Sequence, residues 1–206
     1  AAVTAGFVMA ALWGGNTVAV KIGLAGIPPL ALAGIRFLLG GGTVFVWALA
    51  RKLDLRLEPG KRVAMLLLAA LFLVQIAFLN LGIKLTLAGR SVLFLATYPF
   101  WTALLAHFFV PGDRLSGRMV SGLLLAFSGL ILLFGEGLLA HRGSLAGDLL
   151  ALASGVLLGV RMVYTKRLTA NMHPGKLLVW QSGLSVPAFA LLSFLIEKPG
   201  VPAIDL

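Results

Sequence analysis

The sequence predicts an all-α fold, a polytopic bundle of membrane-spanning helices, from three observations. Of the 206 residues, 60% are hydrophobic and only 12% are charged, and the mean hydropathy is +1.03. A soluble domain has about 25% charged residues, so this chain has too little polar surface to cover a globule of its size. Apolar runs long enough to cross a bilayer recur along the chain, and most charges lie between them. These features exclude an ordinary cytosolic enzyme and a disordered chain.

Seven apolar runs are predicted to span the membrane, because a spanning helix needs about 20 mostly apolar residues. In chain order they are residues 3–22, 29–50, 63–81, 91–110, 119–134, 149–164 and 177–196. The fifth and sixth runs are the shortest and need flanking Gly and Ala residues to span. The first run is too long for a typical signal-peptide core, and no cleavage site followed by a soluble domain comes after it. No segment alternates apolar and polar residues as a barrel strand does.

The basic residues predict how the chain is oriented. The sequence has 17 Lys and Arg against 7 Asp and Glu, a formal net charge of +10. One set of alternate links holds ten basic residues: Arg51, Lys52, Arg56, Lys61, Arg62, Arg114, Arg118, Lys166, Arg167 and Lys176. The other links and the tail hold five: Lys21, Lys84, Arg90, Arg142 and Lys198. Because cytoplasmic loops are enriched in Lys and Arg, we predict a cytoplasmic N-terminus. The positive charge is thus interpreted as membrane orientation and not as nucleic-acid binding.

A weak internal repeat relates the chain to itself at a shift of 145 residues. The shift aligns Gly14 with Gly159, Lys21 with Lys166, Pro29 with Pro174, and Arg36 with Gln181. Chance matching in an apolar chain is the alternative explanation. Five runs precede the second copy, so the two copies would have opposite orientations, as in many secondary transporters. We predict a five-helix repeat at residues 1–139 and the first two helices of a second repeat at 144–206. Seven of ten helices, in two inverted five-helix repeats, would then be present.

Polar side chains inside the spans are the candidate site residues, because in a bilayer they usually face a cavity or the bundle interior. In the run 91–110, Ser91, Tyr98, Trp101 and Thr102 are spaced to share one helical face. Pro99 lies between them and is expected to free a carbonyl in mid-helix. Aromatic rings beside hydroxyls suit a cavity for an amphipathic solute. The alternatives are aromatic packing between helices and an interfacial aromatic belt.

Other spans add further candidates. Arg36 lies about 10 Å along its helix beyond Pro29 and is expected to pair with a substrate anion, to pair with another helix, or to reach the membrane interface. Gln75 is expected to line the cavity or to bridge two helices. Lys21, Asp148 and Arg161 are expected at the interface. The predicted substrate-binding residues are Trp13, Asn16, Thr17, Arg36, Gln75, Tyr98, Trp101, Thr102 and Gln181.

Small residues and absent motifs complete the prediction. Three pairs with small-x3-small spacing are expected to let helices approach closely: Ala10 with Gly14, Gly122 with Ala126, and Gly155 with Gly159. The chain has no Cys, no His-Glu-x-x-His, no nucleotide-binding Gly-rich loop and no acidic pair inside a span. The sequence therefore predicts no catalytic residue, no metal and no cofactor, and we do not expect an enzyme.

Short motifs follow one another in a specific order. The first run contains Leu12-Trp13-Gly14-Gly15-Asn16, and after it come Lys21, Pro28-Pro29 and Arg36. Then come Leu87-Ala88-Gly89-Arg90-Ser91, Tyr98-Pro99-Phe100-Trp101-Thr102 and Gly112-Asp113-Arg114-Leu115-Ser116. This order resembles that of EamA-type members of the drug/metabolite transporter superfamily. The family usually has Leu-Gly-Glu-Arg-Leu-Ser after helix four, where this chain has Pro111 and Asp113 in place of the Leu and the Glu.

The resemblance implies ten helices in two inverted five-helix repeats, and transport of small metabolites or drugs across an inner or plasma membrane. It implies no single substrate. We therefore predict a multi-pass secondary transporter of the inner membrane that exports small molecules by alternating access. Its partners would be a small-molecule substrate and the lipid bilayer, with a homodimer as an option. The alternative is a membrane-embedded flippase or assembly protein without metabolite transport.

Overall fold

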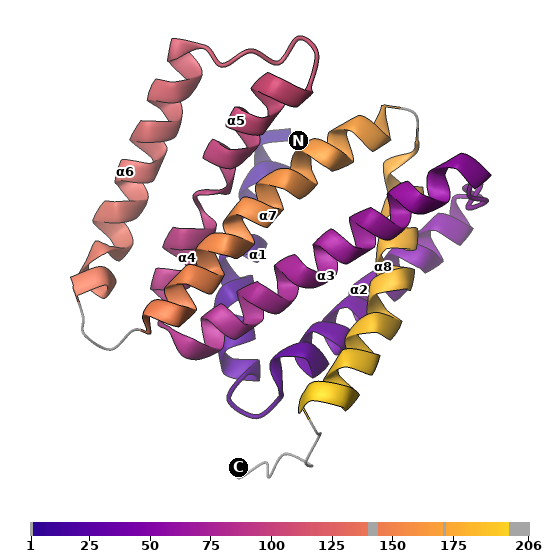
Figure 1. Ribbon diagram of the computed structural model, residues 1–206, viewed down its shortest axis with the longest axis horizontal. Helices are drawn as coiled ribbons and strands as arrows, with labels where there is room; N and C mark the ends of the chain where they lie inside the picture. The colour runs from indigo at the N-terminus through magenta and orange to yellow at the C-terminus, as the bar shows by residue number, and fades with distance from the viewer. Residues whose placement is uncertain (1, 140–143, 171, 198–206) are drawn as a thin grey trace.

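The computed structural model describes residues 2–139, 144–170 and 172–197 (Figure 1). The regular elements in these ranges are helices, which confirms the predicted all-α class. The main helices are α1 (Ala2–Gly23), α2 (Pro29–Ala50), α3 (Arg62–Leu85), α4 (Ala88–Leu95), α5 (Tyr98–Phe109), α6 (Gly117–Leu139), α7 (Leu145–Thr169) and α8 (Pro174–Leu192). A short 3-10 turn, Pro59–Lys61, precedes α3, and a π-helical segment, Ser193–Glu197, continues α8.

The described part of the chain contains five helical segments long and apolar enough to cross a membrane: Pro29–Ala50, Arg62–Leu85, Ala88–Phe109, Leu145–Thr169 and Pro174–Glu197. They correspond to the second, third, fourth, sixth and seventh predicted runs. The fifth run lies on α6, whose apolar stretch Gly117–Leu133 is shorter. The first run lies on α1. The protein is thus a polytopic helical bundle, and spanning by α1 and α6 stays a prediction.

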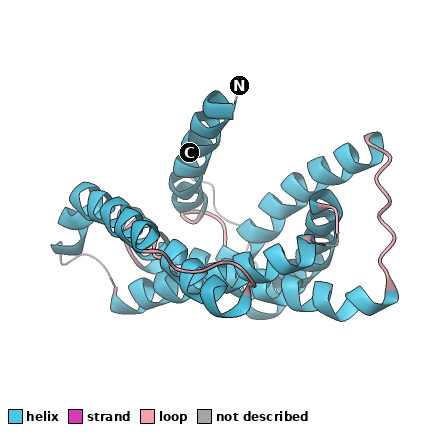
Figure 2. Cartoon of the chain, turned by 90° about the horizontal axis from the view of Figure 1, so that it is seen from above, coloured by secondary structure: helices cyan, strands magenta, loops and turns pink. Residues whose placement is uncertain are grey.

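Helix α3 lies at the centre of the arrangement, between α7 and α8 (Figure 1). Helix α2 pairs with α8, while α4 and α5 pack against α7. Seen from above, α1 leaves the group of helices at a steep angle (Figure 2). Its contacts with described residues are confined mainly to α3 and α4, and apolar side chains such as Phe7 and Leu12 are exposed on it.

An aromatic cluster lies where α2, α3 and α8 pack against one another. The rings of Phe37 and Phe72 meet edge to face with centroids 4.6 Å apart, and Phe37 stacks on Phe189 at 6.0 Å. Leu30, Ala33, Phe72 and Phe189 are buried in this cluster, and Phe37 is partly buried. Edge-to-face and offset pairs are favoured by the ring quadrupole in addition to their apolar burial, so these rings stabilise the contact of the three helices.

Proline and a distant carboxylate define the start of α2. Pro29 occupies the first helical position, where the absent N–H is not needed. The backbone N–H groups of Leu30 and Ala31 donate to the Glu197 carboxylate at 2.7 and 3.1 Å. A carboxylate at a helix N-terminus satisfies free amides and complements the helix dipole. Glu197 therefore links the end of the α8 region to the beginning of α2.

The loops collect at two ends in the alternating way that the charge pattern predicts. At one end, Lys166 forms an ion pair with Asp113 of the α5–α6 link, and Lys176 lies 3.9 Å from Asp54 of the α2–α3 link. At the other end, the Lys21 ammonium donates to the carbonyls of Ile83 and Thr86. The links with more basic residues thus share one end.

The fourth predicted run is wrong in one respect, because it is not a continuous helix. A turn at Ala96 and Thr97 separates α4 from α5, and Pro99 lies in the first turn of α5 instead of in mid-helix. The physical reason is that Pro99 has no N–H to donate to the carbonyl one turn earlier. Thr97 stabilises the break, since its hydroxyl donates to the Phe94 carbonyl at 2.7 Å.

The predicted close approach occurs at Gly155 and Gly159 of α7. A Cβ atom added to Gly159 would lie 2.7 Å from Trp101 Cβ, and one added to Gly155 would lie 3.0 Å from the Phe94 carbonyl oxygen. At Gly14 and Gly122 an added Cβ would meet no atom of a described residue within 4 Å. The prediction of close packing is therefore confirmed on α7 and not at the other two glycines, and the Ala10 side chain lies outside the described part.

Candidate functional site

A cavity of about 370 Å³ lies where α1 faces the break between α4 and α5. Small-molecule sites are commonly concave, mostly apolar and about 300–1,000 Å³ in volume. Two predicted site residues, Thr17 and Tyr98, contribute its hydroxyl groups. The full lining is Gly14, Thr17, Val18, Ala88, Gly89, Val92, Leu95, Ala96 and Tyr98. We take this cavity as the candidate site.

The sequence shapes the cavity through the helix break and through small residues. Because α5 begins at Tyr98, this ring stands at the point where the chain changes direction. Gly14 and Gly89 line the cavity without side chains that would fill it. Thr17 is only 7% exposed and lines the cavity together with residues of α4. The two hydroxyls can hydrogen-bond to a polar group of a solute, while the rest of the lining contacts its apolar part.

Trp101 and Thr102 lie next to Tyr98 on α5 but contact α7. Their atoms surround the position of Gly159, and the Trp101 indole N–H donates to the Thr97 hydroxyl at 3.2 Å. The Thr102 hydroxyl donates to the Tyr98 carbonyl at 2.9 Å. Neither residue lines the cavity, so the predicted polar stripe is divided between the cavity and the α5–α7 contact. Ser91, on α4, is fully buried, and its hydroxyl has no hydrogen-bond partner among the described residues.

Asn16 and Arg36 bind each other. The Arg36 guanidinium donates to the Asn16 side-chain oxygen and thereby joins α2 to α1. Of the three roles considered for Arg36, the structure shows a pairing with another helix. Neither residue lines the 370 Å³ cavity. Trp13 belongs to α1, and its side chain lies outside the described part of the chain.

Gln75 bridges two helices, one of its two predicted roles. Its side-chain amide N–H donates to the Ser154 hydroxyl at 3.0 Å, and that hydroxyl donates to the backbone carbonyl of Gln75 at 3.0 Å. The pair is buried between α3 and α7. Gln181 is buried on α8, away from the cavity lining. The structure therefore brings Thr17 and Tyr98 together and leaves Gln75 and Gln181 in helix contacts.

A buried polar cluster was placed wrongly by the sequence prediction. Asp148 is 3% exposed instead of interfacial, and it accepts hydrogen bonds from the Thr86 hydroxyl at 2.9 Å and from Arg90 Nε at 3.1 Å. Arg90 also forms an ion pair with it. Lys21 is tied to the same region through the Thr86 carbonyl at 2.7 Å. The cause is tertiary, because the donors come from the α3–α4 region and the carboxylate from α7.

Arg161 is also more buried than the sequence predicts. Its guanidinium carbon lies 4.9 Å from the centroid of the Phe72 ring on α3. Its Nε atom is buried and has no hydrogen-bond partner among the described residues. Attraction to the ring face compensates part of the lost hydration. Within the described ranges no three His, Cys, Asp or Glu side chains gather to hold a metal ion.

Comparison with known proteins identifies the family of this chain and a solved structure with a similar fold. Residues 1–135 match the profile of the EamA-like transporter family. The chain belongs to that family. The EamA-family chain also shares its fold with a protein of known crystal structure, at a TM-score of 0.70 and 24% identity, over 93% of this chain and 70% of the other.

Curated relatives of this EamA-family chain include two proteins described as a probable amino-acid metabolite efflux pump. The one from Escherichia coli (strain K12) is 28% identical over 190 residues, and the one from Salmonella typhimurium is 30% identical over 190 residues. Each alignment covers 90% of this chain and 61% of the relative. An uncharacterized transporter from Bacillus subtilis, YvbV, is 35% identical over 161 residues, which cover 76% of this chain and 50% of that protein. The chain thus spans about three-fifths of the length of the two efflux pumps.

Proposed function

We propose that this EamA-family protein is a secondary transporter that exports small amino-acid metabolites by alternating access. The observation that supports it most is the cavity between α1 and the break of α4 and α5. Substrate sites of secondary transporters are typically formed at discontinuous spanning helices, where unwound backbone supplies polar groups. The substrate class comes from the two relatives described as amino-acid metabolite efflux pumps.

In this proposal the predicted residues have two roles. Thr17 and Tyr98 would hold the solute by hydrogen bonds and by the face of the phenol ring. The other predicted residues would complete the site or fix the helices around it: Trp13, Asn16, Arg36, Gln75, Trp101, Thr102 and Gln181. The weak repeat supports alternating access, because inverted repeats generate two alternative arrangements around one site. We also propose an inner-membrane location with the N-terminus in the cytoplasm, from the distribution of Lys and Arg.

Transport by the full-length protein in proteoliposomes tests the site. The probes are the standard radiolabelled L-amino acids, used as a panel, and flux is compared between the wild type and Tyr98→Ala. We expect flux of the transported probe to fall about tenfold or more, since a lost hydrogen bond together with lost ring contact is worth roughly 1.5 kcal/mol or more. Tyr98→Phe, which removes only the hydroxyl, should have an intermediate effect.

Leu104→Ala is the matched control, because Leu104 lies on the same helix, is 42% exposed and does not line the cavity. Its flux should equal that of the wild type. Wild-type flux in Tyr98→Ala would contradict the site assignment. If no solute is transported while a fluorescent phospholipid moves between leaflets, the flippase function replaces export.

A further inference from the structure

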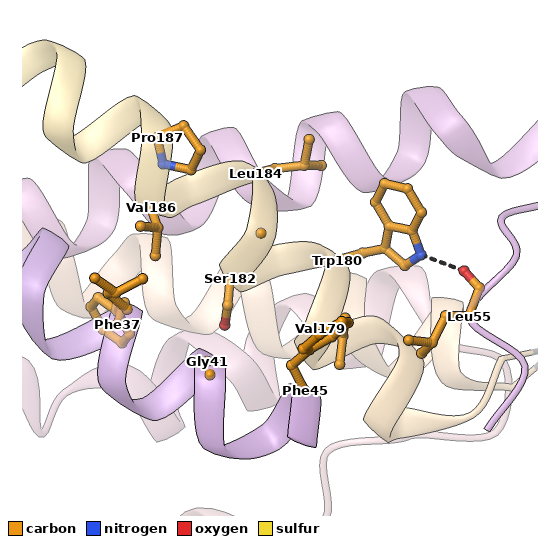
Figure 3. Close-up of a pocket in the computed structure, with 13 residues that line it drawn as sticks. Phe37, Gly41, Phe45, Leu55, Val179, Trp180, Ser182, Leu184, Val186 and Pro187 are labelled. Carbon is orange, nitrogen blue, oxygen red and sulfur yellow. Dashed lines mark hydrogen bonds between the residues drawn. The ribbon is translucent and has the colours of Figure 1, made fainter. Parts of the chain in front are cut away.

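A second and larger cavity lies between α2 and α8, separate from the candidate site (Figure 3). Its volume is about 560 Å³. Phe37, Leu38 and Phe45 line it from α2, and Val179, Val186 and Pro187 line it from α8. We call it the α2–α8 groove. None of the predicted substrate-binding residues lines it.

The groove opens on the outer side of the helix pair. Leu38 is 59% exposed and Phe45 is 44% exposed. Arg36 lies two residues before Leu38, about 200° away around the helix, so the polar and apolar positions face opposite sides of α2. Both helices belong to segments apolar enough to cross the membrane. No described residue covers this side of the groove, so in a membrane its apolar lining is available to the acyl chains of the bilayer.

Glycine residues determine the shape of the groove. At Gly41 the two helices touch, because an added Cβ would lie 2.6 Å from Ser182 Cβ (Figure 3). At Gly42 and Gly183, on either side of the groove, an added Cβ meets no atom of a described residue within 4 Å. The helices are therefore held together at one point while the space beside that point stays open.

The groove has the depth of one leaflet. From Phe37 to Phe45 it extends about 12 Å along α2, since a helix rises about 1.5 Å per residue. The hydrocarbon core is about 30 Å thick, or about 15 Å per leaflet. Trp180 lies where α8 meets the chain after α2, and its indole N–H donates to the Leu55 carbonyl at 2.8 Å (Figure 3). Trp is enriched at membrane interfaces, so we expect this end of the groove at the polar headgroups.

Positive charge surrounds the same end. Arg51, Lys52 and Arg56 follow α2, are exposed and form no ion pair with a described residue. The two acidic groups of this link are paired, Glu58 with Lys61 at 3.2 Å and Asp54 with Lys176 at 3.9 Å. Each basic residue near the surface strengthens attraction to an anionic lipid about fivefold, by the usual value of about 1 kcal/mol at 25 °C.

We propose that the α2–α8 groove binds one acyl chain of an anionic phospholipid, whose phosphate lies among Arg51, Lys52 and Arg56. The acyl chain fills the space beside Gly42 and Gly183, and the headgroup meets the three unpaired cations. The site shares no lining residue with the candidate substrate cavity. It predicts a selective lipid on one face of the helix pair in place of exchangeable bulk lipid.

Native mass spectrometry of the full-length protein tests the site. The probes are palmitoyl-oleoyl phosphatidylglycerol and palmitoyl-oleoyl phosphatidylcholine, added in equal amounts. The wild type should retain phosphatidylglycerol in preference to phosphatidylcholine. Gly42→Leu and Gly183→Leu fill part of the groove and should each lower retention about tenfold, because the displaced chain loses about two buried methylene groups worth about 0.8 kcal/mol each.

Two variants separate the groove from a general surface effect. Gly40→Leu is the matched control, since an added Cβ there also meets open space but Gly40 does not line the groove; it should retain lipid as the wild type does. Arg51→Gln with Lys52→Gln should remove the preference for phosphatidylglycerol and leave phosphatidylcholine retention unchanged.

Photocrosslinking gives a result that does not depend on the folding of any variant. Phosphatidylglycerol with a diazirine in its acyl chain should label peptides from α2 and α8 of the wild type. Labelling elsewhere only, or full retention in both Gly42→Leu and Gly183→Leu, would overturn the proposal. So would a crosslink from Leu38 to a second copy or to another segment of the same protein, because the groove would then have a protein occupant.

Discussion

Asp148 is a buried carboxylate in the first turn of α7, and hydrogen bonds from two residues stabilise its charge. Thr86 and Arg90 supply the donors, and the Asp148 side chain is 4% exposed while that of Arg90 is 13% exposed. A buried charge is tolerated only when it is paired and hydrogen-bonded. The cluster therefore holds the start of α7 against α3 and α4.

Asp148→Asn should destabilise the protein strongly. The change leaves the Arg90 cation without its counter-charge, and breaking a buried pair typically lowers the free energy of unfolding by about 3–5 kcal/mol. Thermal unfolding in detergent micelles measures the effect. Asp113→Asn is the matched control, since its pair with Lys166 is about half exposed, with side chains 42% and 57% accessible; such pairs contribute about 0–1 kcal/mol. Equal melting temperatures for the two variants would show that the buried cluster has no special role in stability.

Some polar residues lie where the sequence predicts them and others do not, because pairings between helices are not visible in the sequence. Thr17 and Tyr98 were predicted from polarity inside apolar runs, and both line the cavity. Asp148 and Arg161 were expected at the membrane interface, since Asp148 directly precedes the predicted run 149–164 and Arg161 lies near its end. Their partners, Arg90 and Phe72, are on other helices. Such pairings depend on tertiary contacts, which a single sequence does not contain.

At the scale of elements, α7 packs through its small residues. Gly155 contacts the carbonyls of Phe94 and Leu95 at the end of α4, and Gly159 contacts Trp101 on α5. Helices in membranes associate through close packing because no hydrophobic force drives them together. The glycines thus hold α7 against both parts of the broken helix, beside the candidate site.

Gly159→Ala should weaken this contact. The new Cβ would lie 2.7 Å from Trp101 Cβ and 3.1 Å from the Thr102 nitrogen, so a helix must shift. Overpacking of this kind typically lowers the free energy of unfolding by about 1–3 kcal/mol, and a lower melting temperature is expected. Gly122→Ala, where the new Cβ meets no described atom within 4 Å, should leave the melting temperature unchanged or raise it, since Ala favours helices by up to about 1 kcal/mol. The reverse order of the two melting temperatures would contradict the close approach of α5 and α7.

The elements themselves were predictable because apolar length and Pro or Gly punctuation are local signals. Each of the seven predicted runs lies on helix in the structure, apart from the turn within the fourth and its last residue, Val110. The turn at Ala96 and Thr97 was not predictable from these local signals. Pro99 indicated a disturbance, but a proline in a spanning helix produces either a kink or a full break. The hydrogen bonds of Thr97 with Phe94 and Trp101 accompany the break, and they were not predicted.

At the scale of the whole molecule, the alternating charge pattern corresponds to real proximity. The links after α2, α5 and α7 share one end, where Asp54 and Asp113 meet lysines of other elements. The sequence predicted this grouping because spans connect opposite sides in turn. Which end is cytoplasmic is a prediction from the positive-inside rule, and the inverted repeat is a further prediction.

Cysteine labelling tests the orientation, and the 206 residues of this chain include no cysteine. Single cysteines replace Arg56 and Arg114 on the basic side and Gly26 and Lys84 on the other, all exposed positions. A membrane-impermeant maleimide added to intact cells should label Gly26→Cys and Lys84→Cys. The other two variants should react only after permeabilisation. The opposite pattern would place the N-terminus outside, and a mixed pattern would contradict the predicted alternation.

The contact between Glu197 and the start of α2 can form only late in the synthesis of the chain. Leu30 and Glu197 are 167 residues apart in the chain. At a synthesis rate of about 5–20 residues per second, Glu197 leaves the ribosome about 8–33 s after Leu30. During that interval the first amides of α2 have no carboxylate acceptor from this residue. The final position of α2 is therefore fixed late, when α8 has entered the membrane beside it.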